Sequence, residues 1–441
     1  MDHGSTARKS AHRDVVMQVL RAALDAVDPY RAVLKSLREH DLSYITGDIY
    51  VLGAGKAGAA MSRAAEEVLG GRLAGGLVIV KDGHVGDFPL ERIELAEASH
   101  PVPDQRGVDA TGRLLEMAAR AGENDLVLCL ISGGGSALMP APADGLTLED
   151  IQQTTQVLLR AGATINELNA VRKHLSRISG GRLARAAAPA RVLSLILSDV
   201  TGSPLDVIAS GPTAPDPTTF QDALSVLTRY GLSHDVPAPL LTGLLAGARG
   251  NVEETPKPGD PLFARVENVI VASNVIAVDA AAAFAAELDL NTMIMSTYVE
   301  GEASEVGRVL AGVAKEIAGY NRPVTKPGCV LFGGETTVTM RGNGVGGRNT
   351  ELALSAAAGI DGIGSGVLVA SLATDGGDGS SPSAGAIVDG TTIAEGEALG
   401  LDHDAALANN DSYTYLSRVG DALMLGPTGT NVNDVMAVFV F

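Results

Sequence analysis

The feature that most constrains the fold is a regular alternation between short aliphatic segments and longer stretches of helical periodicity. The aliphatic segments include IYVLGAGK, DLVLCLISGGGS, RVLSLILSDV and GVLVASLATDG. Helices are expected between many of them, at residues 57–69, 105–120, 148–159, 274–288, 302–317 and 349–358. Strands that alternate with helices indicate βαβ units and mostly parallel sheet. Because the strands are almost continuously apolar, the sheets are expected to be covered on both faces, and the sequence predicts an α/β fold.

Length indicates two domains, since 441 residues exceed what one ordinary core accommodates. Two stretches dense in proline and polar residues, 250–268 and 319–328, have the composition of linkers. We therefore place the main boundary near residue 250 and expect domains at 1–250 and 251–441. The segment CVLFGGETTVTM alternates threonine and valine, which predicts an antiparallel strand pair or a half-exposed strand.

Charge and composition restrict the partners. The net charge of −19 repels nucleic acid and anionic membranes, so an anionic substrate would need local lysine or arginine. The polar N-terminus does not have the pattern of a signal peptide, and no apolar run approaches the roughly 18 residues of a membrane span. We expect a cytoplasmic protein without nucleic-acid or membrane partners. Cys129 and Cys329 lie in apolar segments and are expected to be buried reduced thiols.

Glycines cluster directly after the expected strands. The first glycine loop, residues 53–58, has the pattern G-x-G-x-x-G between a strand and a helix. Gly53 and Gly55 would let backbone N–H groups approach a phosphate at the helix N-terminus. Lys56 within the loop favours a phosphoryl group that is being transferred. Two alternatives stay open: a nicotinamide site in which Asp82 holds a ribose, and a tight turn with an exposed lysine.

A second glycine loop, residues 132–136, follows another apolar strand. Three consecutive glycines cost backbone entropy, which disfavours a purely structural turn. The loop predicts phosphate contacts, while its two serines can instead cap the next helix. Its members are Ser132, Gly133, Gly134, Gly135 and Ser136.

Asp199 follows the next apolar strand, and Thr213 lies in the turn-rich segment after it. A carboxylate at the carboxyl end of a strand lies where open α/β sheets bind ligands. Asp199 is therefore a candidate for Mg²⁺, with capping of a helix as an equal alternative. Thr213 is expected to contact the nucleotide.

The C-terminal half contains a further candidate cluster. Arg348 follows the segment GNGVGG and would begin a helix, with Asn349 beside it. A guanidinium binds carboxylate or phosphate through two hydrogen bonds, so both residues are expected at the substrate. Because the helix dipole disfavours a cation at this end, an anion is expected nearby. Asp375 and Asp378 lie on another glycine loop, where one could accept a hydroxyl proton and the other bind metal.

The alternative for these two aspartates is a turn in which they bond their own backbone, and it fits Asp378 better. His84, His100 and His174 show no metal-ligand spacing and are expected to be structural or surface residues.

Several ordered motifs together resemble the glycerate 2-kinases of the MOFRL type. They include VLGAGKAG, SHPVPD, LISGGGSAL, NAVRKHLS, LSDVTGSPLDVIASGPTAPD, GGETTVT, GVGGRNTELAL, LATDGGDG and GPTGTNVND, and they extend from about Asp14 to the end. The resemblance implies phosphorylation of D-glycerate by ATP to 2-phosphoglycerate, with Mg²⁺. It also implies a Rossmann-like N-terminal domain, a second α/β domain and an active site in the cleft between them.

Residue roles follow by motif. Lys56 resembles the catalytic lysine of that family, and Arg348 its arginine from the other domain. Asp199 and Glu335 are expected to bind metal, and Asp375 to be catalytic. The chain departs from the family pattern at Ser203 and Ser179, where aspartate and lysine are usual.

Two further hypotheses remain open. One is a nicotinamide-dependent hydroxypyruvate reductase that uses the first glycine loop, and the other is a sugar-acid or nucleotide sensor without catalysis. The partners expected are small molecules, and the protein is expected to be a monomer or homodimer.

Overall fold

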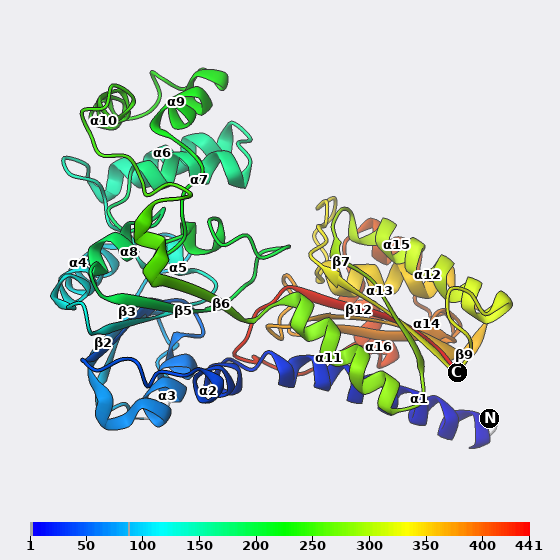
Figure 1. Ribbon diagram of the computed structural model, residues 1–441. Helices are drawn as coiled ribbons and strands as arrows, with labels where there is room; N and C mark the ends of the chain where they lie inside the picture. The colour runs from blue at the N-terminus through cyan, green and yellow to red at the C-terminus, as the bar shows by residue number, and fades with distance from the viewer. Residues whose placement is uncertain (1–2, 87–88) are drawn as a thin grey trace. The chain divides into compact units, whose positions relative to one another are not determined.

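The structure is a computed structural model that describes residues 3–86 and 89–441. It divides into two compact units, which we call the N-terminal unit (Pro29–Val271) and the C-terminal unit (Met1–Asp28 with Ala272–Phe441). Each unit is an α/β sandwich, which confirms the expected fold class (Figure 1). The boundary differs from the one placed near residue 250. After the linker, strand β6 (Val266–Ala272) still pairs with the first sheet, and α1 (His3–Ala26) packs on the second.

The sheet of the N-terminal unit has the order β3-β2-β1-β4-β5-β6, and β1 to β5 run parallel. The chain moves outward from β1 to β3 and then returns to place β4 against the other side of β1. This reversal creates a switch point between β1 and β4, where open α/β sheets bind ligands. The strands are β1 (Ile49–Ala54), β2 (Leu73–Lys81), β3 (Ile93–Ala98), β4 (Leu126–Ile131) and β5 (Arg191–Leu197).

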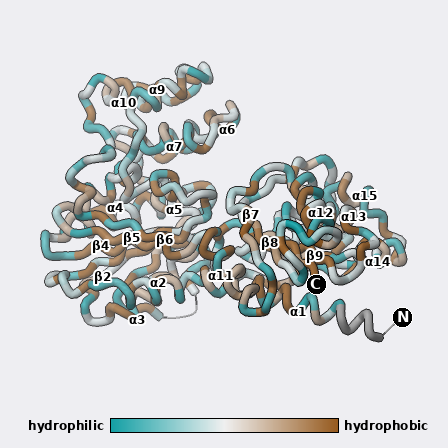
Figure 2. Tube along the Cα trace, turned by 45° about the vertical axis from the view of Figure 1, so that its right-hand side comes forward, coloured by the Kyte–Doolittle hydropathy of each residue, from teal (hydrophilic) through white to brown (hydrophobic). Residues whose placement is uncertain are grey.

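Helices cover both faces of this sheet. Figure 1 shows α2 (Pro29–Glu39) and α3 (Gly58–Leu69) on one face, with α4 (Gln105–Arg120) and α8 (Arg182–Ala187) on the other. Every residue of β4 is buried, as expected for a central strand between two helical layers. In Figure 2 the strands β4, β5 and β6 are accordingly coloured as hydrophobic. The amphipathic α4 begins where the Asp104 carboxylate accepts the N–H of Gly107.

Four further helices form a separate layer of the N-terminal unit. They are α6 (Leu148–Arg160), α7 (Ile165–His174), α9 (Phe220–Arg229) and α10 (Ala238–Ala248). Leucines and valines of these helices pack around Phe220 in a core of their own. Three of the helices begin with a threonine and an acidic residue that cap each other's backbone, at Thr147, Thr164 and Thr219.

The sheet of the C-terminal unit has the order β11-β10-β9-β12-β8-β7. Only β7 and β8 form a parallel pair among its described strands, so the expectation of mostly parallel sheet is wrong for this half. The reason is β12, which inserts antiparallel between β8 and β9 and is buried throughout. The strands are β7 (Asn291–Val299), β8 (Gly328–Gly334), β9 (Gly364–Ala373), β10 (Gly385–Gly390), β11 (Ala422–Leu423) and β12 (Asp434–Val440).

Helices again cover both faces. α1 and α11 (Asn274–Glu287) contact one face, and α12 (Ala303–Tyr320) and α13 (Arg348–Gly359) contact the other (Figure 1). The remaining elements are short: α5 (Gly135–Leu138), α14 (Thr392–Ala398), α15 (His403–Ala408), α16 (Ser412–Val419), and the 3₁₀ turns η1 (Gly70–Arg72), η2 (Ile208–Ser210) and η3 (Pro261–Arg265).

Two smaller expectations are also settled. The strand expected through residues 335–340 is wrong, because β8 ends at Gly334 and Thr337 instead exchanges backbone hydrogen bonds with Gly301 and Ala303. Cys129 and Cys329 are buried free thiols as expected, and burial raises the pKa of Cys129 to about 12. Among the described residues, no helix is long and apolar enough to cross a membrane.

Candidate active site

The two glycine loops of the N-terminal unit lie side by side at the switch point. β1 and β4 end together, with Ala54 opposite Ile131. The N–H of Lys56 then donates to the carbonyl of Gly133 at 3.0 Å, and the N–H of Ser132 donates to the carbonyl of Ala54 at 3.1 Å. These reciprocal bonds join the two loops into one structure at the edge where α/β proteins bind ligands.

Close packing explains the glycines that were predicted to bind phosphate. A Cβ atom at Gly53 would lie 1.9 Å from the carbonyl oxygen of Leu130. At Gly55, whose φ is 147°, it would lie 2.0 Å from the hydroxyl oxygen of Ser132. That hydroxyl accepts the N–H of Ala57 at 3.1 Å, so Ser132 caps the first loop from the second. Contact of these residues with phosphate stays a prediction.

Lys56 is the cation of this edge. Its side chain is half-buried, and its ammonium makes no hydrogen bond or ion pair with the residues that the structure describes. Measured from an added Cβ at Gly134, the Lys56 Cγ lies at 3.6 Å and the His100 Nε2 at 3.0 Å. Lys56 and His100 therefore flank the same glycine of the second loop.

His100 was expected to be a structural or surface residue, and the structure instead places it at the candidate site. Burial lowers its pKa, and the positive charge of Lys56 lowers it further. Both effects favour the neutral imidazole over the protonated one. Its position in the segment SHPVPD, directly after β3 at the same sheet edge, was the signal that the sequence analysis missed.

Asp199 borders the second glycine loop. A Cβ atom at Gly133 would lie 2.2 Å from an Asp199 carboxylate oxygen. Residues 200–207 form turns, so Asp199 does not cap a helix that follows it directly. Its position at the carboxyl end of β5 fits the expected contact with a metal that also binds phosphate.

The other two residues predicted to contact the nucleotide, Ser136 and Thr213, have different hydrogen-bond partners. The Ser136 hydroxyl lies 2.8 Å from that of Ser210, at the end of the second loop. Thr213 is buried, donates to Asn268 at 2.7 Å and accepts from Ser194 at 2.8 Å. Its hydroxyl therefore links β5 to β6, and contact of Thr213 with the nucleotide stays a prediction.

The C-terminal unit gathers its candidate residues at one edge of its sheet. Because β12 runs antiparallel to β8 and β9, the carboxyl ends of both neighbours lie beside its first residue, Asp434. Arg348, at the start of α13, donates from Nε to Asp434 at 2.6 Å and from Nη2 at 2.9 Å. Its Nη1 lies 3.1 Å from Glu335. The protein itself thus supplies the anion that was expected near Arg348.

Burial and ion pairing have opposite effects on the pKa values of Asp434 and Arg348. Asp434 is 1% exposed, and burial raises its pKa to about 6 in spite of the guanidinium. Burial alone would lower the pKa of Arg348, but the hydrogen bond and charge of Asp434 raise it above its ordinary value. The sequence analysis missed Asp434, although a carboxylate that opens the apolar segment DVMAVFV was a usable signal.

Asn349 is buried, and its side chain connects three protein groups. The amide nitrogen donates to Asp434 at 3.0 Å and to Asp378 at 3.3 Å, and its oxygen accepts from Ser371 at 2.6 Å. These bonds favour a positioning role over the predicted contact with substrate.

The two aspartates of the glycine loop differ in burial and in hydrogen-bond partners. Asp378 is buried and caps α13, accepting the N–H groups of Asn349 at 2.9 Å and Thr350 at 2.8 Å. Asp375 is exposed and accepts the N–H of Gly377 at 3.0 Å, which forms the local turn. The turn interpretation therefore fits Asp375 rather than Asp378. Exposure leaves the Asp375 carboxylate accessible to substrate.

No group of three or more histidine, cysteine or acidic residues suited to a metal ion occurs in the described part of the chain. Mg²⁺ commonly binds one or two carboxylates together with phosphate and water, and Asp199 beside the second glycine loop fits this pattern. Glu335 fits it less well, because it already pairs with Arg348 and accepts from Asn433 at 2.8 Å.

The nicotinamide alternative assigned Asp82 to a ribose. Both Asp82 oxygens instead accept from Arg106, at 2.7 and 2.8 Å. This ion pair is exposed to solvent, and a ribose at this position would share Asp82 with Arg106.

Comparison with known proteins identifies the family. A model described as a domain of unknown function, DUF4147, matches residues 15–244, and the MOFRL family model matches residues 328–434. A D-glycerate 2-kinase of Thermotoga maritima is 43% identical over 96% of this chain and 97% of its own length. The crystal structure of glycerate kinase from that organism superimposes with a TM-score of 0.91 and 42% identity, covering 98% of this chain and all of that one.

Two relatives bear a different label. A protein of Agrobacterium vitis, 42% identical over 97% of this chain and 94% of its own length, has a provisional name as a hydroxypyruvate reductase. The sequence motifs, the fold and the relatives agree, and the chain belongs to the MOFRL-type glycerate 2-kinase family.

Proposed function

We propose that the protein transfers the γ-phosphoryl group of ATP to the 2-hydroxyl of D-glycerate, which yields 2-phosphoglycerate and ADP. The observation that supports this most strongly is the half-buried Lys56 side chain, which belongs to the first glycine loop, lies beside Gly134 of the second and has no anionic partner among the described residues. Phosphoryl transfer needs positioning and positive charge more than covalent chemistry from the protein. Such a cation beside backbone donors supplies both.

The N-terminal unit would bind the phosphates. Lys56 would pair with the transferring phosphoryl group, and N–H groups of the second glycine loop would donate to its oxygens. A bound Mg²⁺ would neutralise phosphate charge, with Asp199 as its protein ligand. Neutral His100 can donate a hydrogen bond without adding a second positive charge.

The C-terminal unit would bind the acceptor. Two of the five N–H groups of Arg348 donate to Asp434, and Nη1 lies 3.1 Å from Glu335. The remaining N–H groups would bind the glycerate carboxylate. The exposed Asp375 would accept the hydroxyl proton as the phosphoryl group arrives. That Lys56 and Arg348 act on one ligand in an interdomain cleft stays a prediction, as do the cytoplasmic location and the oligomeric state.

The test is an assay with ATP, Mg²⁺ and D-glycerate in which the product is identified by ³¹P NMR. The proposal predicts a phosphate ester at the 2-hydroxyl and stoichiometric ADP. Loss of NADH with hydroxypyruvate, together with no phosphorylation of glycerate, would instead establish the reductase.

A further inference from the structure

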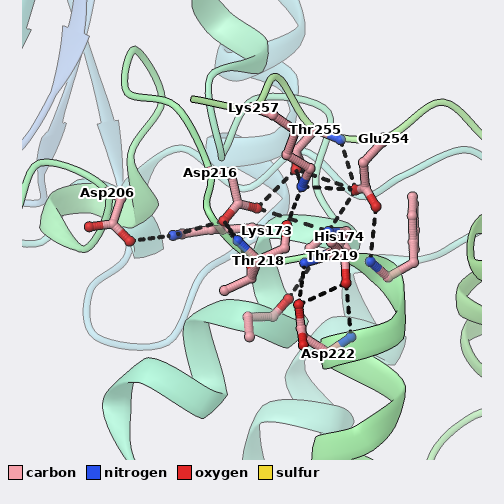
Figure 3. A network of polar contacts seen from close by, with 12 residues as sticks. Lys173, His174, Asp206, Asp216, Thr218, Thr219, Asp222, Glu254, Thr255 and Lys257 are labelled. Atoms are coloured by element: carbon pink, nitrogen blue, oxygen red, sulfur yellow. Dashed lines mark hydrogen bonds and ion pairs between the residues drawn. The ribbon is translucent and has the colours of Figure 1, made fainter. Parts of the chain in front are cut away.

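Lys173, on α7, is a buried charge that the proposed chemistry does not use. It is 1% exposed, and its ammonium lies 3.0 Å from Asp206 and 3.3 Å from Asp216 (Figure 3). Asp216 is buried as well, whereas about a third of the Asp206 side chain is exposed. An ammonium removed from water in this way needs carboxylate partners. Lys173 is therefore placed to hold its two partners rather than to meet a ligand.

The segment between these two aspartates contains a strained turn. Ala209 and Ser210 have φ values of 49° and 60°, in the left-handed region that residues other than glycine rarely adopt. Such a conformation persists only where the surrounding structure holds it. Lys173 connects the chain before the turn, through Asp206, to the chain after it, through Asp216.

The strained turn contacts the second glycine loop. The Ser210 hydroxyl lies 2.8 Å from that of Ser136, and a Cβ atom at Gly135 would lie 2.9 Å from the Cβ of Ala209. Ser210 also donates to Asn169 at 3.3 Å. Asn169 precedes Lys173 by four residues on α7, so both side chains are on the same helix face. Side chains on one face of α7 thus hold the strained turn in place, and this turn packs against the second glycine loop.

We propose that Lys173 is a positioning residue for the second glycine loop: through Asp206 and Asp216 it fixes the turn at Ala209 and Ser210, and this turn sets the position of Gly135 and Ser136. The inference rests on the proposed function, because the ligand that the loop binds is the phosphate chain of ATP.

The same network offers a matched control. Lys257 donates to Thr255 at 2.7 Å and lies 3.4 Å from Glu254 (Figure 3). Within the part of the chain that the structure describes, it contacts neither Asp206 nor the strained turn. Lys257 also donates to the carbonyl of Thr218. We expect its replacement to remove a charge from the network while both ion pairs of Lys173 stay in place.

The experiment compares Lys173→Met, Asp206→Asn and Lys257→Met in the full-length protein. Thermal melts establish folding, calorimetric titration measures the Kd for ATP, and steady-state kinetics separates the KM values. We expect Lys173→Met and Asp206→Asn to weaken ATP binding at least about tenfold and to raise the KM for ATP, while the KM for D-glycerate changes less than about twofold. Lys257→Met should bind ATP within about twofold of the wild type.

A merely structural role would lower the active fraction, and hence kcat, without changing the Kd for ATP of the folded protein. Wild-type ATP affinity in both folded variants would therefore overturn the proposal. Weak binding in Asp206→Asn alone, with a folded Lys173→Met that binds normally, would also overturn it and assign Asp206 to the ligand itself. If Lys173→Met does not fold, Asp206→Asn decides, because it leaves the pair of Lys173 with Asp216 in place. A wild type that binds no ATP would refute the proposed function and this inference together.

Discussion

The two candidate cations of this protein have opposite surroundings. Lys56 lies beside two glycine loops and a neutral histidine, and the described residues give it no carboxylate partner. Arg348 holds the buried Asp434 through two hydrogen bonds and pairs with Glu335 as well. In the sequence, both residues are cations that lie beside glycines. The structure shows that the lysine is available to a ligand anion, whereas much of the arginine's charge is already used for the fold.

The largest expected effect is on activity at Lys56. Replacing Lys56 by methionine should lower kcat at least about a hundredfold, because the transition-state charge loses a positioned cation. The free energy of unfolding should change by less than about 0.5 kcal/mol, because no carboxylate of the described residues loses a pairing partner. Lys35→Met, at an exposed position of α2, is the control and should retain full activity. Wild-type turnover of Lys56→Met would remove the lysine from the mechanism.

Arg348→Met should lose stability as well as activity. Asp434 would be left buried without its guanidinium, and breaking a buried pair in this way costs roughly 3 kcal/mol. Arg13 provides the matched control, since it forms an ion pair with the buried Asp421 in the same unit. Urea denaturation should show both variants destabilised, but only Arg348→Met should reduce kcat of the folded protein. If both folded variants had the same kcat, the role of Arg348 would be restricted to stabilising the fold.

The pH dependence sharpens this comparison. Burial raises the folded pKa of Asp434 to about 6, above its value in the unfolded chain. The folded state therefore binds this proton more tightly, and its contribution to stability is present at low pH and lost as the pH rises through about 6. The destabilisation by Arg348→Met should accordingly be larger at pH 8 than at pH 5. If the destabilisation by Arg348→Met were independent of pH, Asp434 would not carry an uncompensated charge in this variant.

Intermediate effects are expected at the two aspartates of the 374–379 loop, one on stability and the other on kcat. Asp378→Ala removes the cap of α13 and should cost about 2 kcal/mol of unfolding free energy. Asp375→Ala should leave stability unchanged and lower kcat about a hundredfold if its carboxylate accepts the hydroxyl proton. Denaturation and kinetics on both variants test this. The reverse pattern would assign the catalytic carboxylate to Asp378 and the structural one to Asp375.

The smallest expected effect concerns His100. Its folded pKa is lowered by burial and by Lys56, so the unfolded chain takes up a proton at pH values where the native state does not. This part of the stability is present above the unfolded pKa of about 6.5 and is lost as the pH falls below it. Stability profiles of the wild type and His100→Gln should therefore diverge in acid. Parallel profiles between pH 7 and 5 would place His100 in a solvated environment.

Local patterns made much of the fold predictable. The helix at 105–120 was predicted to the residue, because Asp104 caps it and its buried positions recur at helical spacing. Lys56 was found for a related reason, since a strand, a glycine turn and a helix follow one another directly in the chain. The resemblance to the kinase family added the substrate, which no local pattern provided.

Long-range pairing was not predictable. Arg348 and Asp434 are separated by 86 residues, and only the antiparallel insertion of β12 brings them together. Thr213 appeared to be a ligand because a turn-rich loop surrounds it, but its partner Asn268 lies on the later strand β6. The cap that Asp378 provides to α13 was not predicted for the same reason, because the capped helix precedes Asp378 in the chain.

The account depends on the Lys56 ammonium meeting the phosphate of ATP beside the second glycine loop. A crystal structure with a non-hydrolysable ATP analogue, Mg²⁺ and D-glycerate tests this directly. The predicted result is a γ-phosphate oxygen within hydrogen-bonding distance of the Lys56 Nζ and of backbone N–H groups in residues 133–136. An analogue bound with its phosphates away from both, in crystals of an active enzyme, would contradict it.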